Sequence, residues 1–95
     1  MKNKQRGSVP DKGDIVWITL DPTLGHEQKG RRPALVITDI EFNKNTKLAM
    51  ICPITSKFKN YAFQVELLDE KTDGVVMVDQ LKSIDWEVRN LEFIE

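Results

Sequence analysis

Only one cysteine and one histidine occur among the 95 residues of this chain. Because Cys52 has no second cysteine to pair with, no internal disulfide can form, and its place in the apolar run 48–52 predicts a small buried side chain in a reducing compartment. No apolar stretch is long enough to span a membrane, and the polar N-terminus lacks the apolar region of a signal peptide. We therefore expect a cytoplasmic protein.

Charge is nearly balanced in this chain. The 14 lysines and arginines face 15 aspartates and glutamates, which gives a net charge of −1. The chain as a whole is thus not drawn to nucleic acid, and any binding of that kind must come from a local patch. The sequence has no clustered metal-ligand pattern either, so neither a metal nor another cofactor is expected.

Long helical patterns are missing too, because no extended stretch repeats apolar residues every 3.6 positions. Short segments rich in Val, Ile, Phe and Trp, separated by turn formers, predict strands at residues 14–20, 33–38, 47–55, 62–67 and 74–79. Residues 39–43 and 85–90 could each form a helical turn. The second and fifth segments are apolar on both faces, which predicts a sheet covered on both sides. We expect one mainly β domain over residues 13–95, a small barrel or strongly curled sheet of five to six antiparallel strands, after a flexible polar arm over residues 1–12.

The loop between the first two predicted strands carries the clearest chemical signal. It reads Gly25-His26-Glu27-Gln28-Lys29-Gly30-Arg31-Arg32-Pro33 and holds the only histidine, a carboxylate and a run of cations. Cationic groups can hold phosphate, while a carboxylate and an imidazole can move protons, and cleavage of a phosphodiester needs these functions without requiring a metal. The first hypothesis is therefore an RNA-cutting site.

Six short motifs occur along the chain in a fixed order. They are Gly13-Asp14-Ile15-Val16-Trp17, Leu20-Asp21-Pro22-Thr23, Gly25-His26-Glu27-Gln28, Arg32-Pro33-Ala34-Leu35-Val36, Pro53-Ile54-Thr55 and Asp79-Gln80. In this order the chain resembles the MazF/PemK/Kid toxins of bacterial toxin–antitoxin systems, from about Gly13 to Ile94. The resemblance implies an SH3-like (CcdB/PemK-type) barrel and a homodimer. It also implies a metal-independent, sequence-specific endoribonuclease that cuts single-stranded RNA such as mRNA through 2′-hydroxyl attack, inhibits translation and growth, and is inhibited by a small acidic MazE-like antitoxin.

The resemblance also assigns roles to particular residues. The catalytic arginine of the family matches Arg32 and the catalytic threonine matches Thr55, while Glu27 and His26 match the loop glutamate and histidine. Contacts to RNA are expected from the polar residues near these positions, namely Gln28, Lys29, Arg31, Ser56, Lys57, Asp79, Gln80 and Lys82. Arg32 suits the stabilisation of charge on phosphorus, because its guanidinium is permanently charged and matches phosphate oxygens. Either Glu27 or His26 could be the general base, and that choice stays open.

The chain departs from the family pattern at two places. Where the PemK/Kid branch has an arginine two residues before the aspartate that matches Asp79, this chain has Met77, so the scheme that rests on Arg32 and Thr55 is the better guide. Family members also continue beyond the segment matching residues 90–94 into a C-terminal helix. Since the sequence ends at Glu95, most or all of that helix is expected to be lacking.

Each candidate residue also has an ordinary structural interpretation. A loop glutamate or histidine can simply be solvated, Arg31 and Arg32 could protect a strand edge, and threonine is a good strand residue. Three functions therefore remain: an endoribonuclease toxin, a binding-only toxin with the same barrel, such as a gyrase poison of the CcdB kind, and an inactive RNA-binding or interaction module.

Overall fold

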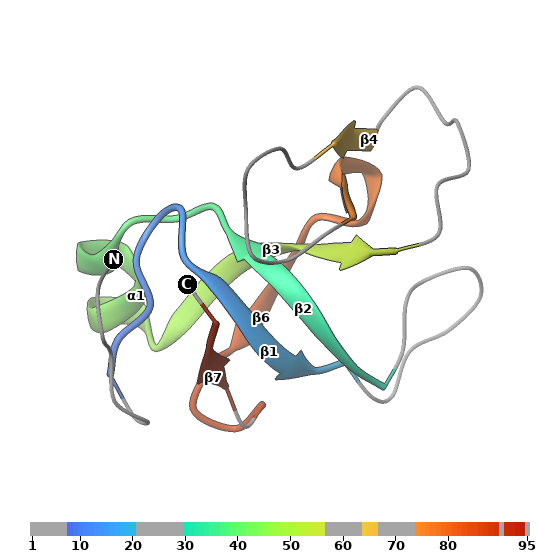
Figure 1. The fold of residues 1–95 in the computed structure, drawn as a ribbon. Helices are drawn as coiled ribbons and strands as arrows, with labels where there is room; N and C mark the ends of the chain where they lie inside the picture. Colours follow the sequence, from blue (N-terminus) through green and yellow to red (C-terminus); the bar gives the residue numbers. More distant parts are fainter. Residues whose placement is uncertain (1–7, 21–29, 57–63, 67–73, 90, 95) are drawn as a thin grey trace.

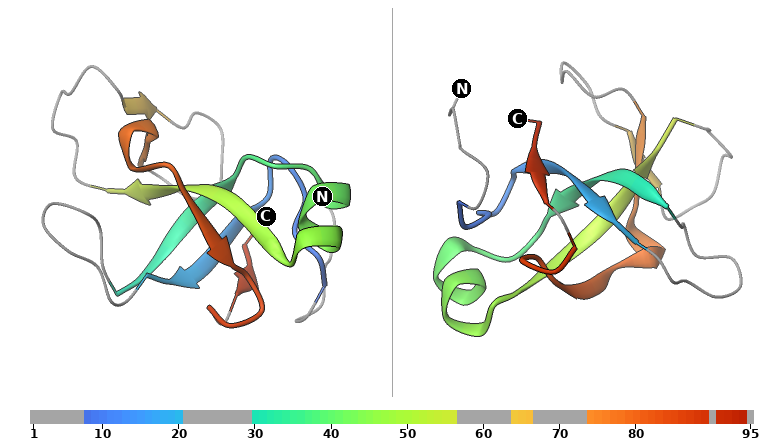
Figure 2. Two further views of the ribbon diagram at one scale, coloured as in Figure 1. Left: turned by 180° about the vertical axis from the view of Figure 1, so that it is seen from behind. Right: turned by 90° about the horizontal axis from the view of Figure 1, so that it is seen from below.

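The computed structural model describes residues 8–20, 30–56, 64–66, 74–89 and 91–94. Along the chain the elements are β1 (Ile15–Thr19), β2 (Arg31–Val36), α1 (Ile40–Thr46), β3 (Leu48–Thr55), β4 (Gln64–Glu66), β5 (Val75–Met77), the 3-10 turn η1 (Val78–Gln80), β6 (Lys82–Asp85) and β7 (Glu92–Phe93). Figure 1 shows α1 at one end of the sheet and β4 at the other, and the two views of Figure 2 agree. Within these residues no helix has the length and apolar character needed to cross a membrane.

The described strands pair antiparallel into one seven-stranded sheet in the order β4-β5-β3-β2-β1-β7, with β6 also on β3. Strand β3 is central, because Ile51 pairs with Val36 of β2 on one edge and with Lys82 of β6 on the other. The prediction of a mainly β, antiparallel, SH3-like fold is confirmed. The sheet is strongly curled but, over the described residues, open, because its end strands β4 and β7 do not pair with each other.

Two strands fall outside the segments predicted as strands. Residues 82–85 form β6 because they pair with the first half of β3, although Ile84 is their only apolar residue, and residues 92–93 form β7 against β1. The predicted strand 74–79 ends early, because its last residues turn into η1. The predicted turn at 39–43 is the start of α1.

The turn η1 is an insertion in the pairing along β3. From the pair Ile54–Val76 to the pair Ile51–Lys82, β3 moves by three residues while the opposing chain moves by six. The three extra residues fold out of the ladder, as in an enlarged β-bulge. The Asp79-Gln80 motif therefore lies on the edge of β3 that faces away from β2.

Apolar side chains cover both faces of this sheet. One cluster buries Val16, Ile18, Leu20, Ala34, Val36, Ala49, Ile51, Ile84, Trp86 and Leu91. A smaller one on the other face buries Ile15, Cys52, Ile54 and Val76. The division follows the two-residue alternation of strands, since Ile51 and Cys52 are neighbours in β3 and belong to different clusters.

A buried amide ties α1 to the rest of the domain. Asn43 is fully buried, its Nδ2 donates to the carbonyl oxygens of Pro10 (2.8 Å) and Thr38 (3.0 Å), and its Oδ1 accepts from the Thr38 hydroxyl (2.5 Å). Its backbone carbonyl accepts from the Trp86 indole N–H at 3.0 Å. Pro10 belongs to the segment expected to be an arm, and it is among the fully buried side chains. Residues 1–7 lie outside the described residues.

Replacing Asn43 by alanine is expected to destabilise the domain by about 2–4 kcal/mol, because several buried polar groups lose their partners together. Urea unfolding followed by circular dichroism measures the change. Asn45→Ala is the matched control, since Asn45 is exposed on the same helix, and its effect should stay within about 0.5 kcal/mol. Equal effects of the two substitutions would show that the amide network contributes little.

Candidate active site

Arg32 lies near the start of β2 and Thr55 at the end of β3. The ladder between the two strands runs from the pair Val36–Ile51 to the pair Ala34–Pro53, and Arg32 and Thr55 each lie two residues beyond its last pair. The ladder stops at Ala34 and Pro53, and Figure 1 shows the two strands diverging beyond this point. The two predicted catalytic residues are thus brought to the same end of the sheet, on strands rather than on loops.

Burial differs between these two side chains. Thr55 is only 4 % exposed and lies on the side of β3 opposite to Ile54, which belongs to the smaller apolar cluster. Arg32 is half-buried and pairs across β1 with Ile18, a member of the larger cluster. An arginine and a hydroxyl thus lie at the border of the larger apolar cluster, where rigid strands can hold them in place.

His26 and Glu27 lie outside the described residues, as do Gln28, Lys29 and Lys57. The connection that contains the first four begins after Leu20 and ends at Gly30, and the Leu20 N–H donates to the Gly30 carbonyl at 2.8 Å. Gly30 is two residues before Arg32. Both ends of this connection are therefore fixed at the end of the sheet where Arg32 lies.

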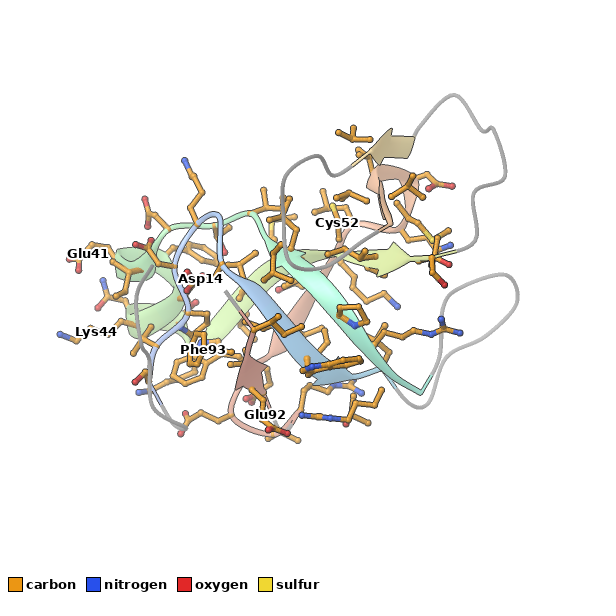
Figure 3. All side chains as sticks on the ribbon, viewed as in Figure 1. Asp14, Glu41, Lys44, Cys52, Glu92 and Phe93 are labelled. Atoms are coloured by element: carbon orange, nitrogen blue, oxygen red, sulfur yellow. The ribbon has the colours of Figure 1, made fainter. Side chains whose placement is uncertain are left out.

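Arg31 belongs to the other face. It pairs with Thr19, while Arg32 pairs with Ile18, and neighbouring strand residues point to opposite faces. Its guanidinium donates to Glu92 Oε1 at 2.6 Å and to the Thr19 hydroxyl at 3.3 Å. Figure 3 shows Glu92 on β7, at the edge of the sheet. The structure therefore separates Arg31 from Arg32, although the two are adjacent in sequence.

The remaining residues predicted to contact RNA lie in different parts of the described structure. Ser56 is exposed directly after Thr55, and Lys82 pairs with Ile51, so alternation places Lys82 on the same side of β3 as Thr55. Ile51, beside which Lys82 lies, is four residues from Thr55, so Lys82 and Thr55 are separated by roughly 13 Å along β3, at about 3.2–3.4 Å per residue. Asp79 is exposed and Gln80 half-buried, and both lie in η1. No group of three or more possible metal ligands occurs among the described residues.

An open apolar pocket on the second face was not predicted from the sequence. Its volume is about 250 Å³, and it is lined by Leu35, Ile37, Cys52, Val65, Val76, Val78 and Leu81. Val65 is 56 % exposed, so the second face is open to solvent at this part of the described chain. The apolar residues on both faces of the second and fifth predicted strands are the sequence feature that could have indicated this apolar pocket.

Comparison with known proteins identifies the family of this chain. The family model for the PemK-like, MazF-like toxins of type II toxin–antitoxin systems matches residues 11–95. This chain belongs to that family. It is 44% identical over 81 residues to the endoribonuclease toxin MazF of Escherichia coli K12, which covers 85% of this chain and 73% of that relative.

Solved structures agree with this assignment. The fold superimposes with a TM-score of 0.85 on a crystal structure of MazF from Deinococcus radiodurans, at 45% identity over 90% of this chain and 79% of the other. A MazE–MazF structure from the same organism gives a TM-score of 0.79 at 44% identity, over 92% of this chain and 79% of the other. The family resemblance seen in the six sequence motifs is confirmed.

Among the described residues that line the pocket, Cys52 is the one whose pKa is shifted. Burial raises the pKa of its thiol, and the nearby negative charge of Asp79 raises it further. Figure 3 shows Cys52 on the side of the molecule that carries β4. The native thiol therefore keeps its proton at a pH where the thiol of the unfolded chain has already lost it.

Stability should consequently fall as the pH rises above about 8.5, the pKa of an unperturbed thiol, because the unfolded state then binds fewer protons than the native state. Urea unfolding at pH 8 and pH 10 measures the slope. Cys52→Ala should have a flatter dependence than the wild type, and Asp79→Asn an intermediate one. Parallel curves for all three chains would contradict this prediction.

Proposed function

We propose that this chain is an endoribonuclease toxin that cuts single-stranded RNA, mRNA included, without a metal ion, and that it thereby inhibits translation and growth in the cytoplasm. The observation that carries the proposal is that Arg32 and Thr55 both lie just beyond the last pair of the β2–β3 ladder, at the same end of these two strands. Support comes from the relatives that are named endoribonucleases, among them PemK of Escherichia coli at 36% identity.

RNA carries its own nucleophile, the 2′-hydroxyl next to the scissile phosphate. The protein has to remove that proton, stabilise the charge that builds up on the phosphate oxygens, and protonate the leaving 5′-oxygen. Arg32 serves the second task with a fork of N–H donors, and the hydroxyl of Thr55 donates to the same oxygens. Glu27 and His26 share the two proton transfers. The products carry a 2′,3′-cyclic phosphate and a 5′-hydroxyl.

Other polar residues hold the RNA strand on either side of the cut. Ser56 directly follows Thr55, and Lys82 lies on the Thr55 side of β3. At roughly 13 Å along the strand, Lys82 contacts a neighbouring phosphate rather than the scissile one. Gln28, Lys29, Lys57 and Gln80 extend this contact, while Asp79 accepts hydrogen bonds from base edges. Arg31, whose guanidinium is ion-paired with Glu92 on the other face, contacts RNA only at the border of the site.

Cleavage of a single-stranded RNA in EDTA should give discrete products, and Arg32→Ala should lower the rate by at least about 10²-fold, because a donor aimed at developing charge is lost. Arg32→Lys should recover little, since a point charge cannot replace the bidentate fork. The cuts are resolved on a sequencing gel, and the product ends are checked by mass spectrometry.

Lys44→Ala is the matched control for this experiment, because Lys44 is an exposed cation on α1, at the far end of the sheet. It should cut at the wild-type rate. Activity that vanishes in EDTA and returns with Mg²⁺ would overturn the metal-independent mechanism. A wild-type chain that binds RNA but never cuts it would instead point to a binding-only protein of the same fold.

The inhibitor that we propose is a small acidic antitoxin of the MazE kind. One relative structure of this fold is a MazE–MazF pair. The chain itself has a net charge of −1, so an acidic partner must bind locally basic segments, and the segment around Lys29 and Arg32 provides such charge. An acidic chain on these residues competes directly with RNA phosphate, and raised salt weakens both complexes.

We further propose a homodimer whose interface includes the apolar pocket. Four residues of its lining are exposed by more than a third, namely Ile37 (37%), Val65 (56%), Val78 (43%) and Leu81 (44%). No lining residue is charged, so neither RNA nor an acidic antitoxin finds a complementary charge there. A second copy related by a two-fold axis brings the same neutral, apolar surface to both sides.

Val65→Glu is expected to raise the dimer dissociation constant by about 10²-fold or more, because the substitution buries an unpaired charge in the interface. Val88→Glu is the matched control, since Val88 is 77% exposed in the turn after β6 and does not line the pocket. Light scattering over a concentration series measures the mass. A Val65→Glu chain that stays dimeric at the same concentrations as Val88→Glu would refute this interface.

A further inference from the structure

Gly74, directly before β5, approaches the end of β3 more closely than any side chain would allow. Its φ is +141°, a value that residues with a side chain rarely adopt. A Cβ atom at this position would lie 2.5 Å from the carbonyl oxygen of Thr55 and 3.1 Å from Cγ2 of Ile54. The first distance is shorter than real contacts of a Cβ atom, and the atom in the way belongs to the backbone, so it cannot rotate aside.

The other described glycines with positive φ differ in this respect. Gly13 (φ +89°) and Gly30 (φ +80°) have open space where a Cβ would stand, with no atom within 4 Å. A substitution at Gly13 therefore introduces backbone strain alone. A substitution at Gly74 introduces the same kind of strain and also pushes on Thr55.

We propose that Gly74 is a positioning residue for Thr55 in RNA cleavage; this inference rests on the proposed function. Thr55 is 4% exposed and pairs with Val75, the residue that follows Gly74. The bare backbone of Gly74 lets β5 close onto the last residue of β3. The position of the Thr55 hydroxyl is thus fixed from the side of β3 away from Arg32.

The geometry explains how a substitution at Gly74 would affect RNA cleavage. Arg32 is held on β2 by its pairing with Ile18 of β1, and β5, which Gly74 precedes, lies on the opposite edge of β3 from β2. A side chain at position 74 would therefore move Thr55 and leave Arg32 in place, which changes the separation of the two groups that hold the phosphate. A misplacement of about 1 Å can lower a rate 10²-fold.

Steady-state cleavage of RNA by Gly74→Ala and Gly13→Ala tests the proposal. Gly74→Ala should lower kcat by about 10-fold to 10²-fold relative to Gly13→Ala, while KM for RNA stays within about twofold, because Thr55 and not the remaining RNA contacts is displaced. In a Thr55→Ala background the same substitution should cost less than about twofold, because it acts through Thr55. A structural defect alone would lower the activity equally in both backgrounds.

Amide resonances of Ile54 and Thr55, recorded for both glycine variants, show directly whether the end of β3 moves. Should Gly74→Ala be incompletely folded, all variants are compared in trimethylamine N-oxide, which favours the compact state. Equal kcat values for Gly74→Ala and Gly13→Ala, or an undiminished loss in the Thr55→Ala background, would overturn the proposal. A wild-type chain that does not cut RNA would overturn the proposed function and with it the catalytic role, and the resonances alone would then decide whether Gly74 positions Thr55.

Discussion

The pairing of β3 with its neighbours on both edges is the constraint on which the other features depend. On one edge, residues 48–51 pair with β6 and the last two residues pair with β5; on the other edge, residues 51–53 pair with β2. The change from β6 to β5 falls beside Pro53, which has no N–H to donate to a ladder. The ladder with β2 also ends at Pro53, and Arg32 and Thr55 lie at the ends that separate.

This arrangement makes the site sensitive to register. Since strand residues alternate between faces, a slip of one residue between β2 and β3 would exchange Arg32 for Arg31 on the face that holds Thr55. The apolar residues resist such a slip, because it would move Ala34 and Val36 of β2 out of the larger core cluster. The buried amide of Asn43 adds a second restraint, as it fixes α1 immediately before β3. The relative placement of Arg32 and Thr55 thus depends on core packing at some distance from these two residues.

Much of this fold could be predicted from the sequence. Residues 47–55 predict β3 almost to the residue, because apolar β-branched positions and flanking turn formers agree there. The placement of Arg32 and Thr55 at one end of the β2–β3 pair and the strand at 82–85 could not be predicted in this way, since both depend on register between segments far apart in the chain. The close approach of Gly74 to Thr55 is equally hidden. A glycine before a strand looks like any other turn residue until its φ and its neighbours are known.

The two faces of the sheet carry different kinds of surface. Toward one face, β3 presents Thr55, and Lys82 follows on the same side from β6, so the proposed RNA site combines a hydroxyl group and a positive charge. Toward the other face, β3 presents Ile54 and Cys52, and Cys52 lines an uncharged pocket. A single strand thus carries residues of both proposed surfaces in alternation. Because a Cβ atom at Gly74 would meet both Thr55 and Ile54, the backbone there restrains residues on both faces of β3 at once.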